Sequence, residues 1–323
     1  MNISYDYYRI FYFVAKHQSF TRAAAILMNN EPNISRAIKN LEHALGCTLF
    51  IRSNRGVTLT PEGQKLYTRV AAAHHQLLSA ESELADAKSL TSGTISLGVS
   101  ETALQLMMLP KIRAFHQKFP DIKIHISSVT TPQAISSLKN GLVDLAIVTS
   151  PTGIARPLHE TILAPLPEIL IGGPRFAHLS GDPISLEQAA KYPFILLNNQ
   201  TNAHNYHTRF FLEHGVSLRP DIEVATTEQI LSLIKYDLGI GFLPEQIAME
   251  TLLKKEVFQI RLDCELPARS ICLVKNPSQP ASIAAHNMAA MPERINRFFH
   301  FVIFYASFSF VHKNIYTSSY SIV

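Results

Sequence analysis

Apolar residues recur at helical spacing in two short stretches near the amino end, which predicts two helices joined by a turn at residues 28–30. The first helix shows an i, i+3, i+4, i+7 stripe at Phe20, Ala23, Ala24 and Leu27. The second starts with Asn30 as N-cap and Pro32 in its first turn. Its inner face is predicted at Ile34, Ala37, Ile38, Leu41 and Leu45, and its outer face at Asn33, Ser35, Arg36, Lys39 and Asn40.

This pair of helices has the size and polarity of a helix-turn-helix, whose second helix fits the DNA major groove. A solvated outer face is the alternative for such a hairpin. The next pattern favours DNA: residues 48–52 and 57–60 alternate as strands around a tight turn at 53–56. We expect a wing with Arg52 and Arg55 at its tip, placed to hold phosphates.

A longer helix is predicted over residues 61–90. Thr60 is its capping residue, Pro61 its first residue, and a Thr-Ser-Gly run ends it. Apolar residues alternate in steps of four and three, which is a heptad seam that calls for a partner helix. Packing of this seam on the chain's own domain is the alternative. The dimerisation candidates are Leu66, Val70, Leu77 and Leu84.

The remainder reads as alternating strands and helices. Strands at 95–99, 122–126 and 144–148 are separated by helical stretches, which predicts a parallel α/β unit. A second lobe is predicted from about residue 165, with strands at 168–172, 194–197, 222–224, 239–244 and 257–260 and helices at 206–213 and 227–236. A strand at 270–274 should return the chain to the first lobe.

Charge is concentrated at the amino end. The 323 residues carry a net charge of +4 with 47 % hydrophobic and 17 % charged residues. Residues 1–60 alone hold seven Lys and Arg against three acidic residues, which gives this segment +4 as well. A local basic excess is an electrostatic footprint for nucleic acid. The three cysteines, Cys47, Cys264 and Cys272, form no C-x-x-C pair and indicate a reducing cytosol. Cys264 and Cys272 are interpreted as structural thiols rather than a redox pair.

The amino-terminal run resembles the winged helix-turn-helix of LysR-type transcriptional regulators. The match lies in Phe11, Val14, Ala15, Ser19–Thr21, Ala23, Ala24, Leu27, Pro32, Ser35, Arg36, Ile38, Leu41, Glu42, Leu45, Gly46, Leu49, Phe50, Arg52 and Leu59–Gly63. One departure is the pair before the proline, which is usually serine-glutamine in the family and is Asn30-Glu31 here. Glutamate repels phosphate and prefers to accept from cytosine N4. The DNA-binding candidates are Thr21, Asn30, Glu31, Asn33, Ser35, Arg36, Lys39, Arg52 and Arg55.

Residues 109–110, 119–120 and 141–147 resemble the co-inducer domain of the same family, which is similar to periplasmic solute-binding proteins. The resemblance implies a multidomain α+β chain, with a winged helix-turn-helix at 1–60, a dimerisation linker helix at 61–90 and a two-lobed α/β effector-binding domain at 91–297. Lobe one is expected at 91–163 and 268–297, and lobe two at 164–267.

The effector site is predicted from topology, because ligands of parallel α/β lobes bind beyond the carboxyl ends of strands and beside helix amino ends. Hydroxyl and amide side chains recur at five such places, although each one alone reads as a helix cap. Their convergence favours a small polar or anionic ligand. The candidates are Ser100, Glu101, Thr102, Thr130, Thr131, Thr149, Ser150, Thr201, Asn202 and Thr226, within the runs 100–102, 130–131, 149–150, 199–202 and 226–227.

The sequence contains no enzyme signature: G-x-S-x-G and H-E-x-x-H are both absent. His204 and His207 have a spacing that could hold a metal, but without a third ligand we interpret them as surface or pocket-rim residues. Asp144 is assigned a turn or capping role. No cofactor and no catalytic residue are expected.

Taken together, these patterns indicate a cytoplasmic, effector-switched transcriptional regulator. Its expected partners are a double-stranded DNA operator, a second or further copies of itself as homodimer or homotetramer, and the small ligand, with RNA polymerase as a further candidate and no membrane. A solute-binding module without DNA function, and an α/β enzyme, are the alternatives. Residues 298–323 form an apolar tail that could be a membrane-surface anchor, a buried strand or, as we favour, an atypical terminus from an altered reading frame.

Overall fold

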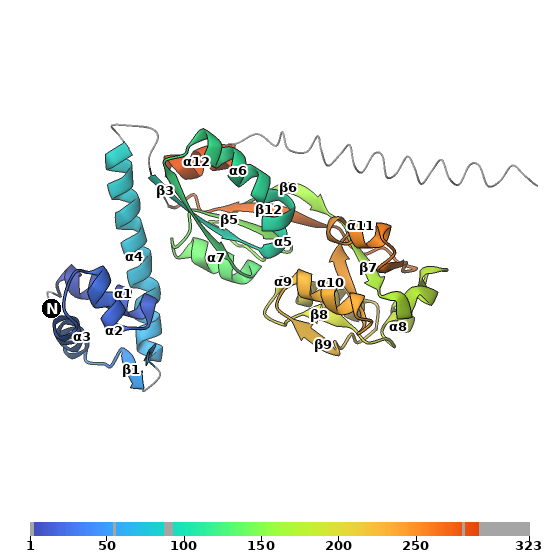
Figure 1. Cartoon of the computed structure of the whole chain (residues 1–323), viewed down its shortest axis with the longest axis horizontal. Coiled ribbons are helices and arrows are strands. Elements are labelled where there is room, and N and C mark those ends of the chain that lie inside the picture. Colours follow the sequence, from blue (N-terminus) through green and yellow to red (C-terminus); the bar gives the residue numbers. More distant parts are fainter. Residues whose placement is uncertain (1–2, 54–55, 87–92, 280–281, 291–323) are drawn as a thin grey trace, which may run out of the picture.

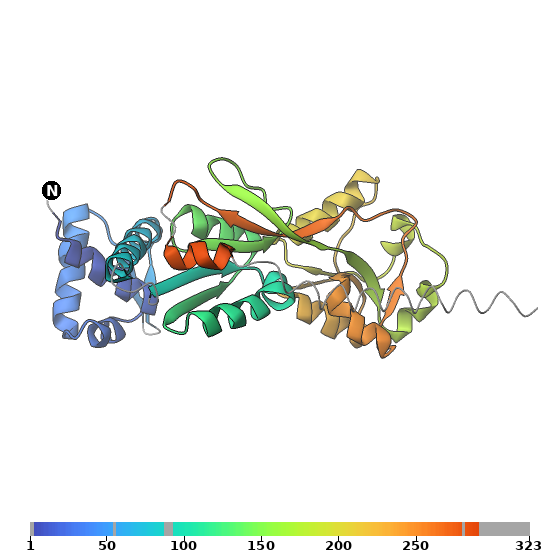
Figure 2. The ribbon, with the colours of Figure 1, turned by 90° about the horizontal axis from the view of Figure 1, so that it is seen from above.

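The structure is a computed structural model that describes residues 3–53, 56–86, 93–279 and 282–290. These residues form a small helical domain at one end, a long helix beside it, and two α/β lobes in a row (Figures 1 and 2). This arrangement confirms the predicted fold class. The predicted wing tip at residues 54–55, the predicted end of the long helix at 87–90 and the tail at 298–323 lie outside the described residues.

The first domain is a three-helix unit followed by a two-stranded wing: α1 (Tyr5–His17), α2 (Phe20–Ile26), α3 (Glu31–Leu45), β1 (Phe50–Ser53) and β2 (Gly56–Leu59). Its core is made of apolar residues from all three helices and the wing, including Phe11, Phe20, Ile34, Leu41 and Phe50. Gly46 ends α3 with a φ of 69°, a left-handed conformation that glycine adopts without a Cβ penalty. The predicted helix-turn-helix and wing are therefore confirmed.

The long helix α4 (Pro61–Asp86) begins where the wing ends. The Thr60 hydroxyl accepts the backbone N–H of Gly63 at 2.9 Å, as a helix cap does. The two helices α1 and α4 lie against one another, so the linker helix is also a wall of the winged-helix domain.

Lobe one is built on a five-stranded sheet in the order β4-β3-β5-β12-β6. The three strands predicted as parallel are parallel, whereas β12 and β6 run antiparallel to their neighbours. Helices cover both faces of the sheet (Figure 1). The elements are β3 (Gly93–Val99), α5 (Glu101–Ala103), a π-helical turn η1 (Leu104–Met108), α6 (Leu109–Lys118), β4 (Ile122–Ser128), α7 (Thr131–Lys139), β5 (Leu145–Thr149), β6 (His159–Leu166), β12 (Arg269–Lys275) and α12 (Ile283–Ala290).

Lobe two has a three-stranded sheet in the order β10-β7-β11 and a parallel pair β8-β9, joined by a bridge between Phe194 and Ile240. Two apolar clusters fill it, one on each side of the strands. The elements are β7 (Glu168–Gly172), a 3₁₀ helix η2 (Pro174–Ser180), α8 (Leu186–Ala189), β8 (Ile195–Leu197), α9 (Asn202–Glu213), β9 (Ile222–Val224), α10 (Thr227–Lys235), β10 (Ile240–Pro244), α11 (Glu245–Leu253) and β11 (Phe258–Ile260).

The boundary between the lobes lies at Pro167, a few residues later than predicted. The reason is β6, which the sequence patterns did not predict: it pairs with β12 along its whole length and belongs to the sheet of lobe one. The chain then enters lobe two at Glu168 and returns at Arg269. Lobe two is therefore inserted between two strands of lobe one.

Candidate DNA-binding surface and effector cleft

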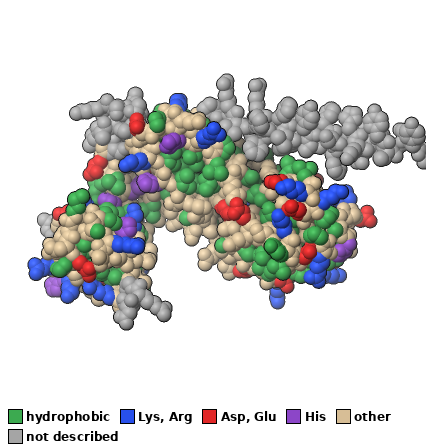
Figure 3. Space-filling view, in the orientation of Figure 1, with side chains coloured by type: hydrophobic (Ala, Val, Ile, Leu, Met, Phe, Trp, Pro, Cys, Tyr) green, Lys and Arg blue, Asp and Glu red, His purple; other side chains and the backbone are tan. Residues whose placement is uncertain are grey.

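The recognition helix α3 presents a polar face to solvent. Its N-cap is Asn30, as predicted, because the side-chain oxygen accepts the N–H of Asn33 at 2.9 Å. Arg36, Lys39 and Asn40 are exposed, while Ile34, Ala37, Ile38 and Leu41 are buried in the domain core. Leu45, which was predicted on the inner face, is 37 % exposed at the end of the helix. Basic side chains are numerous at this end of the molecule (Figure 3). An exposed helix of this kind can enter a major groove without rearrangement.

Two hydrogen bonds organise the front edge of this surface. The Thr21 hydroxyl of α2 donates to Glu31 Oε2 at 2.8 Å. Asn33 Nδ2 donates to Asn29 Oδ1 at 3.0 Å. The start of α2 and the end of the turn between α2 and α3 are therefore tied to the first turn of the recognition helix.

Arg52 does not lie at the wing tip, which corrects the prediction. It sits within β1, opposite Val57, and its guanidinium lies 4.1 Å from the ring centroid of Phe20. Its Nη2 also donates to Ser35 Oγ at 3.0 Å. Arg52 and Ser35 therefore hold the wing against the recognition helix. Arg55 falls outside the described residues.

A cleft of about 400 Å³ lies between the two lobes. Most of its lining side chains are polar and uncharged, with one carboxylate from Glu101 and a few apolar residues such as Val129 and Leu197. The structure brings nine of the ten predicted effector residues to this cleft: Ser100, Glu101, Thr102, Thr130, Thr131, Thr149, Thr201, Asn202 and Thr226. Sequence reasoning missed Ser128, Gln133 and Asn198 as further lining residues. Gln133 is the partner of Thr130 in a capping box, a signal that the sequence carried.

Ser150 lies outside the cleft, which corrects its assignment. Its hydroxyl accepts the N–H of Ser270, and its own N–H donates to the carbonyl of the same residue, both at 2.8 Å. Ser150 therefore joins β5 to the start of β12. Asn199, the first residue of its predicted run, does not line the cleft either.

Three of the lining threonines are helix caps. Thr130, Thr201 and Thr226 accept backbone N–H groups in the first turns of α7, α9 and α10. Three helix amino ends therefore meet at one cavity, and their dipoles favour acceptor or anionic groups there.

Ser100 differs from these three threonines. It precedes α5 but makes no capping bond, and its hydroxyl oxygen is buried with no hydrogen-bond partner among the described residues. A buried hydroxyl without a partner costs free energy. Its hydrogen-bonding capacity is therefore unused within the described part of the chain.

The lobes touch each other across the cleft. The hydroxyls of Thr102 and Thr227 are 3.2 Å apart, and Glu101 Oε2 accepts the N–H of Thr227 at 3.3 Å. Burial raises the pKa of the Glu101 carboxyl, although the N–H of Thr227 opposes this shift. Asn202 Nδ2 donates to the carbonyl of Pro151 at 2.7 Å. These bonds join residues of lobe one to helices of lobe two.

Behind the cleft, a buried ion-pair cluster spans the crossing between the lobes. Glu168, the first residue of β7, accepts from Arg269 Nη1 at 2.6 Å and lies 2.9 Å from His207 Nε2. Burial alone would raise the pKa of Glu168, but Arg269 and His207 lower it to about 2. Arg269 also donates to Thr149 Oγ1 at 2.9 Å in lobe one. No sequence signal marked Glu168 and Arg269 as partners.

The histidine pair is structural. His207 is 5 % exposed and belongs to this cluster, so it is not a surface residue; of the two predicted positions it has the one beside a pocket, because it lines a small cavity with Thr102 and Thr149. His204 Nδ1 lies 2.8 Å from the carbonyl of Leu197. Among the described residues, no group of three His, Cys, Asp or Glu could hold a metal ion. Asp144 Oδ2 accepts the N–H of Ser96 in β3 at 2.7 Å, a contact between distant segments rather than the turn or capping bond that was predicted.

The cysteines are free thiols in the structure. Cys272 is buried in β12, whereas Cys264 is half-buried. Burial, reinforced by Glu160, raises the pKa of the Cys272 thiol to about 12. No helix in the described part of the chain is both long and apolar enough to span a membrane.

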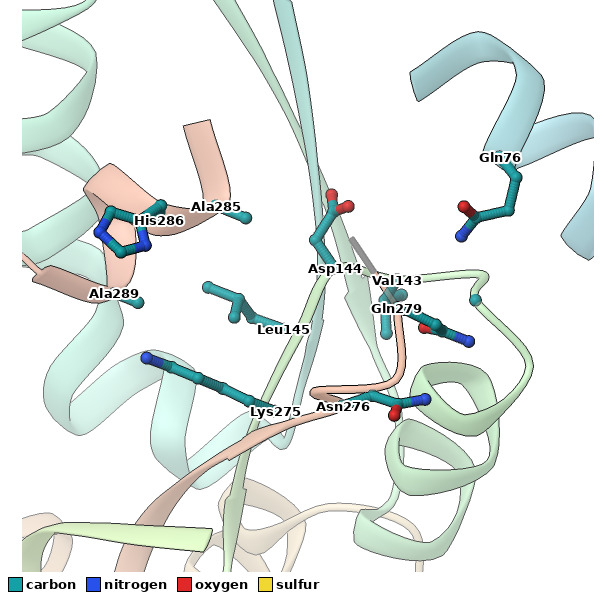
Figure 4. A pocket seen from close by; sticks show the side chains of 11 residues that line it. Gln76, Val143, Asp144, Leu145, Lys275, Asn276, Gln279, Ala285, His286 and Ala289 are labelled. Atoms are coloured by element: carbon teal, nitrogen blue, oxygen red, sulfur yellow. The ribbon is translucent and has the colours of Figure 1, made fainter. Parts of the chain in front are cut away.

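The linker helix touches lobe one directly. His75 Nε2 lies 3.1 Å from Ser96 Oγ on β3. The next residue of the same helix, Gln76, lines a small cavity of about 70 Å³ that also takes in Asp144, Gln279 and Lys275. Figure 4 shows Gln76 entering from α4 while Lys275 extends toward α12. The effector domain is thereby in contact with the helix that carries the DNA-binding domain.

The predicted heptad seam divides into two parts. Val70 is buried in the core of the winged-helix domain and Leu66 is partly buried against it, which favours the alternative that this stretch packs on the chain's own domain. Tertiary contacts within the chain cover that stretch. Leu77 is 46 % exposed and its neighbour Leu78 is 51 % exposed. The side chain of Leu84 lies outside the described part of the chain.

A winged helix-turn-helix joined by a long helix to a two-lobed α/β domain with a polar cleft defines a ligand-responsive DNA-binding protein. Residues 5–64 match the family model of the bacterial regulatory helix-turn-helix protein, lysR family, and residues 88–292 match the LysR substrate binding domain. The chain therefore belongs to the LysR family of transcriptional regulators. The match to the DNA-binding model decides against a solute-binding module without DNA function.

Curated relatives agree with this assignment. The HTH-type transcriptional regulator BbuR of Bordetella bronchiseptica is 28 % identical over 74 % of each chain. A probable RuBisCO transcriptional regulator of Porphyra purpurea is 29 % identical over 88 % of this chain and 91 % of its own.

Solved structures share the fold. A full-length OxyR variant from Pseudomonas aeruginosa has a TM-score of 0.65 at 20 % identity, and the match covers 90 % of this chain and 96 % of that one. Full-length CbnR, solved in complex with its target DNA, has a TM-score of 0.65 at 16 % identity, with coverage of 88 % and 98 %.

Proposed function

We propose that this regulator is switched by a small polar or anionic molecule that binds in the cleft between the lobes. The observation that carries the proposal is the unpartnered Ser100 hydroxyl, buried in a cleft where the amino ends of α7, α9 and α10 converge. A ligand that bears acceptor oxygens would complete the hydrogen bond of Ser100 and lie near three helix dipoles.

Operator reading would be divided between two kinds of residue on α3. Arg36 has the planar fork that suits guanine O6 and N7, and Lys39 has the point charge that suits phosphate. Asn33 and Ser35 would add polar contacts beside them. Arg52 would support the wing rather than contact DNA alone, because it is already bonded to Ser35.

Dimerisation would use the exposed part of α4 around Leu77 and Leu78, where two apolar side chains stand clear of the chain's own core. A dimer would place two recognition helices on one operator, and larger assemblies would follow from further contacts of the effector domains.

The test starts from the operator. Genomic fragments bound by the full chain are sequenced, and the affinity of the recovered site is measured in gel shifts at several salt concentrations. Lys39→Ala should weaken binding to all sequences and lower the salt slope by about 1, whereas Arg36→Ala should relax discrimination at one base pair, by about 1–3 kcal/mol. Recovery of no reproducible site would overturn the operator assignment.

The cleft is tested separately. Small polar and anionic compounds, suggested by the genes beside the recovered operator, are screened for a rise in thermal stability of the full chain. A compound that binds the wild-type protein and alters operator affinity supports the proposal. A compound that does both equally well in a Ser100→Ala variant and in a Thr131→Val variant would move the effector site elsewhere.

A further inference from the structure

Glu31 occupies the leading position of the recognition helix. It is the first residue of α3, directly after the Asn30 cap, and its side chain is exposed. In helix-turn-helix proteins the side chains at the amino end of the recognition helix are those that meet base edges. A carboxylate at this point is repelled by DNA phosphates, and a hydrogen-bond donor on a base edge would offset that repulsion.

The carboxylate of Glu31 is oriented by a neighbouring helix. Thr21 Oγ1 donates to Glu31 Oε2 at 2.8 Å, which fixes one oxygen against α2. Within the described residues, Glu31 forms no ion pair, so no cation of the chain neutralises its carboxylate. Its second oxygen is left to accept a hydrogen bond from outside. Arg36 and Lys39 on the same helix would offset the repulsion from phosphate.

An ionised carboxylate accepts hydrogen bonds and donates none. In the major groove, guanine presents two acceptors and thymine one, and these repel it. Adenine presents its N6 donor beside the N7 acceptor, so a carboxylate gains one contact and meets one repulsion. Cytosine presents the N4 amino group alone, which is the matched partner for an acceptor-only side chain.

We propose that Glu31 selects cytosine in the operator through the N4 amino group, and that Thr21 is the positioning residue that holds the carboxylate for this contact. The inference rests on the proposed operator reading by α3. It adds a base preference at one defined residue.

The experiment is a selection of binding sites from randomised double-stranded DNA with the full chain, followed by sequencing. Wild-type protein should enrich cytosine by about tenfold over other bases at one position in each half-site. Glu31→Gln should shift the preference at that position to adenine, because glutamine pairs with adenine N6 and N7. Glu187→Gln removes the same charge from an exposed site in lobe two and should select the wild-type sequence.

Thr21 is tested by a pair of variants. Thr21→Val loses the hydroxyl and should weaken the cytosine preference severalfold while the rest of the selected site is kept. Thr21→Ser keeps the hydroxyl and should behave as wild type. A Thr21→Val protein with an unchanged preference would overturn the positioning role.

Two further outcomes are distinct from each other. A wild-type protein that selects a defined site, with the same base at every position after Glu31→Gln, would overturn the cytosine contact and leave the operator assignment intact. A wild-type protein that selects no defined site would overturn the operator assignment itself, and the cytosine contact with it.

Discussion

The hydroxyls of Thr102 and Thr227 meet at 3.2 Å across the cleft, one from each lobe. A side-chain bond of this kind contributes about 0.5–1.5 kcal/mol. Thr102→Val should therefore favour separation of the lobes by roughly 2- to 12-fold. Faster hydrogen exchange at the amino ends of α5 and α10 would show this change. Thr161→Val, on an exposed stretch of β6, is the control and should leave exchange unaltered.

Ser100→Ala should lower the affinity for the effector without lowering the stability of the fold. The variant removes a buried hydroxyl that has no partner among the described residues, so the free energy of unfolding should stay the same or rise slightly. Effector affinity should fall by about 1–3 kcal/mol, because a ligand oxygen would lose its partner. Calorimetric titration measures the affinity and thermal unfolding the stability. A clear loss of stability with unchanged affinity would show that Ser100 is purely structural.

The buried cluster behind the cleft predicts acid sensitivity. The pKa of Glu168 is lowered from 4.5 to about 2 in the folded chain. A lowered folded-state pKa stabilises the fold above the unfolded value, so this contribution is present above pH 4.5 and is lost as the pH falls toward 2.

Removal of the Glu168 charge by mutation should lower the stability of the fold, as protonation at low pH does. Glu168→Gln should destabilise the chain by about 3–5 kcal/mol at neutral pH, because Arg269 is left buried without its counter-charge. Urea unfolding from pH 7 down to pH 3 measures both effects. Glu213→Gln, which breaks the exposed pair with Arg209, should cost less than about 1 kcal/mol. Equal effects of the two variants would contradict the account of the cluster.

The exposed side chain of Leu77 on the linker helix predicts that two chains form a dimer through this helix. Leu77→Glu should dissociate a dimer at micromolar concentration, because it places a charge in the apolar contact. Sedimentation velocity measures the change. Leu253→Glu, at a position of α11 that is 79 % exposed, should leave the assembly intact. A wild-type chain that sediments as a monomer would contradict the dimer.

The sequence predicted features that depend on local chemistry. Asn30 caps α3 and Gly46 ends it because these roles follow from the residue types alone. Polar residues after strands meet in one cleft because parallel topology places strand ends together. Such signals need no knowledge of distant contacts.

The features that it missed depend on distant contacts. Glu168 and Arg269 are 101 residues apart, and no periodicity links them. The apolar spacing of Leu66 and Val70 predicted a covered face correctly but could not say that the chain's own domain covers it. Arg52 was placed at the wing tip because the sequence does not show how the wing packs on α3; the bond between Arg52 and Ser35 depends on that packing.

The insertion of lobe two between β6 and β12 has a consequence for how this regulator can diversify. Both chain crossings lie side by side, at Pro167 and next to Arg269, so lobe two begins and ends at one place. Lobe two contributes one side of the cleft and is connected to α4 only through lobe one. Exchange of lobe two between relatives would change the specificity of the cleft for its ligand. The operator specificity would stay the same, because the DNA-binding domain lies at the other end of the chain.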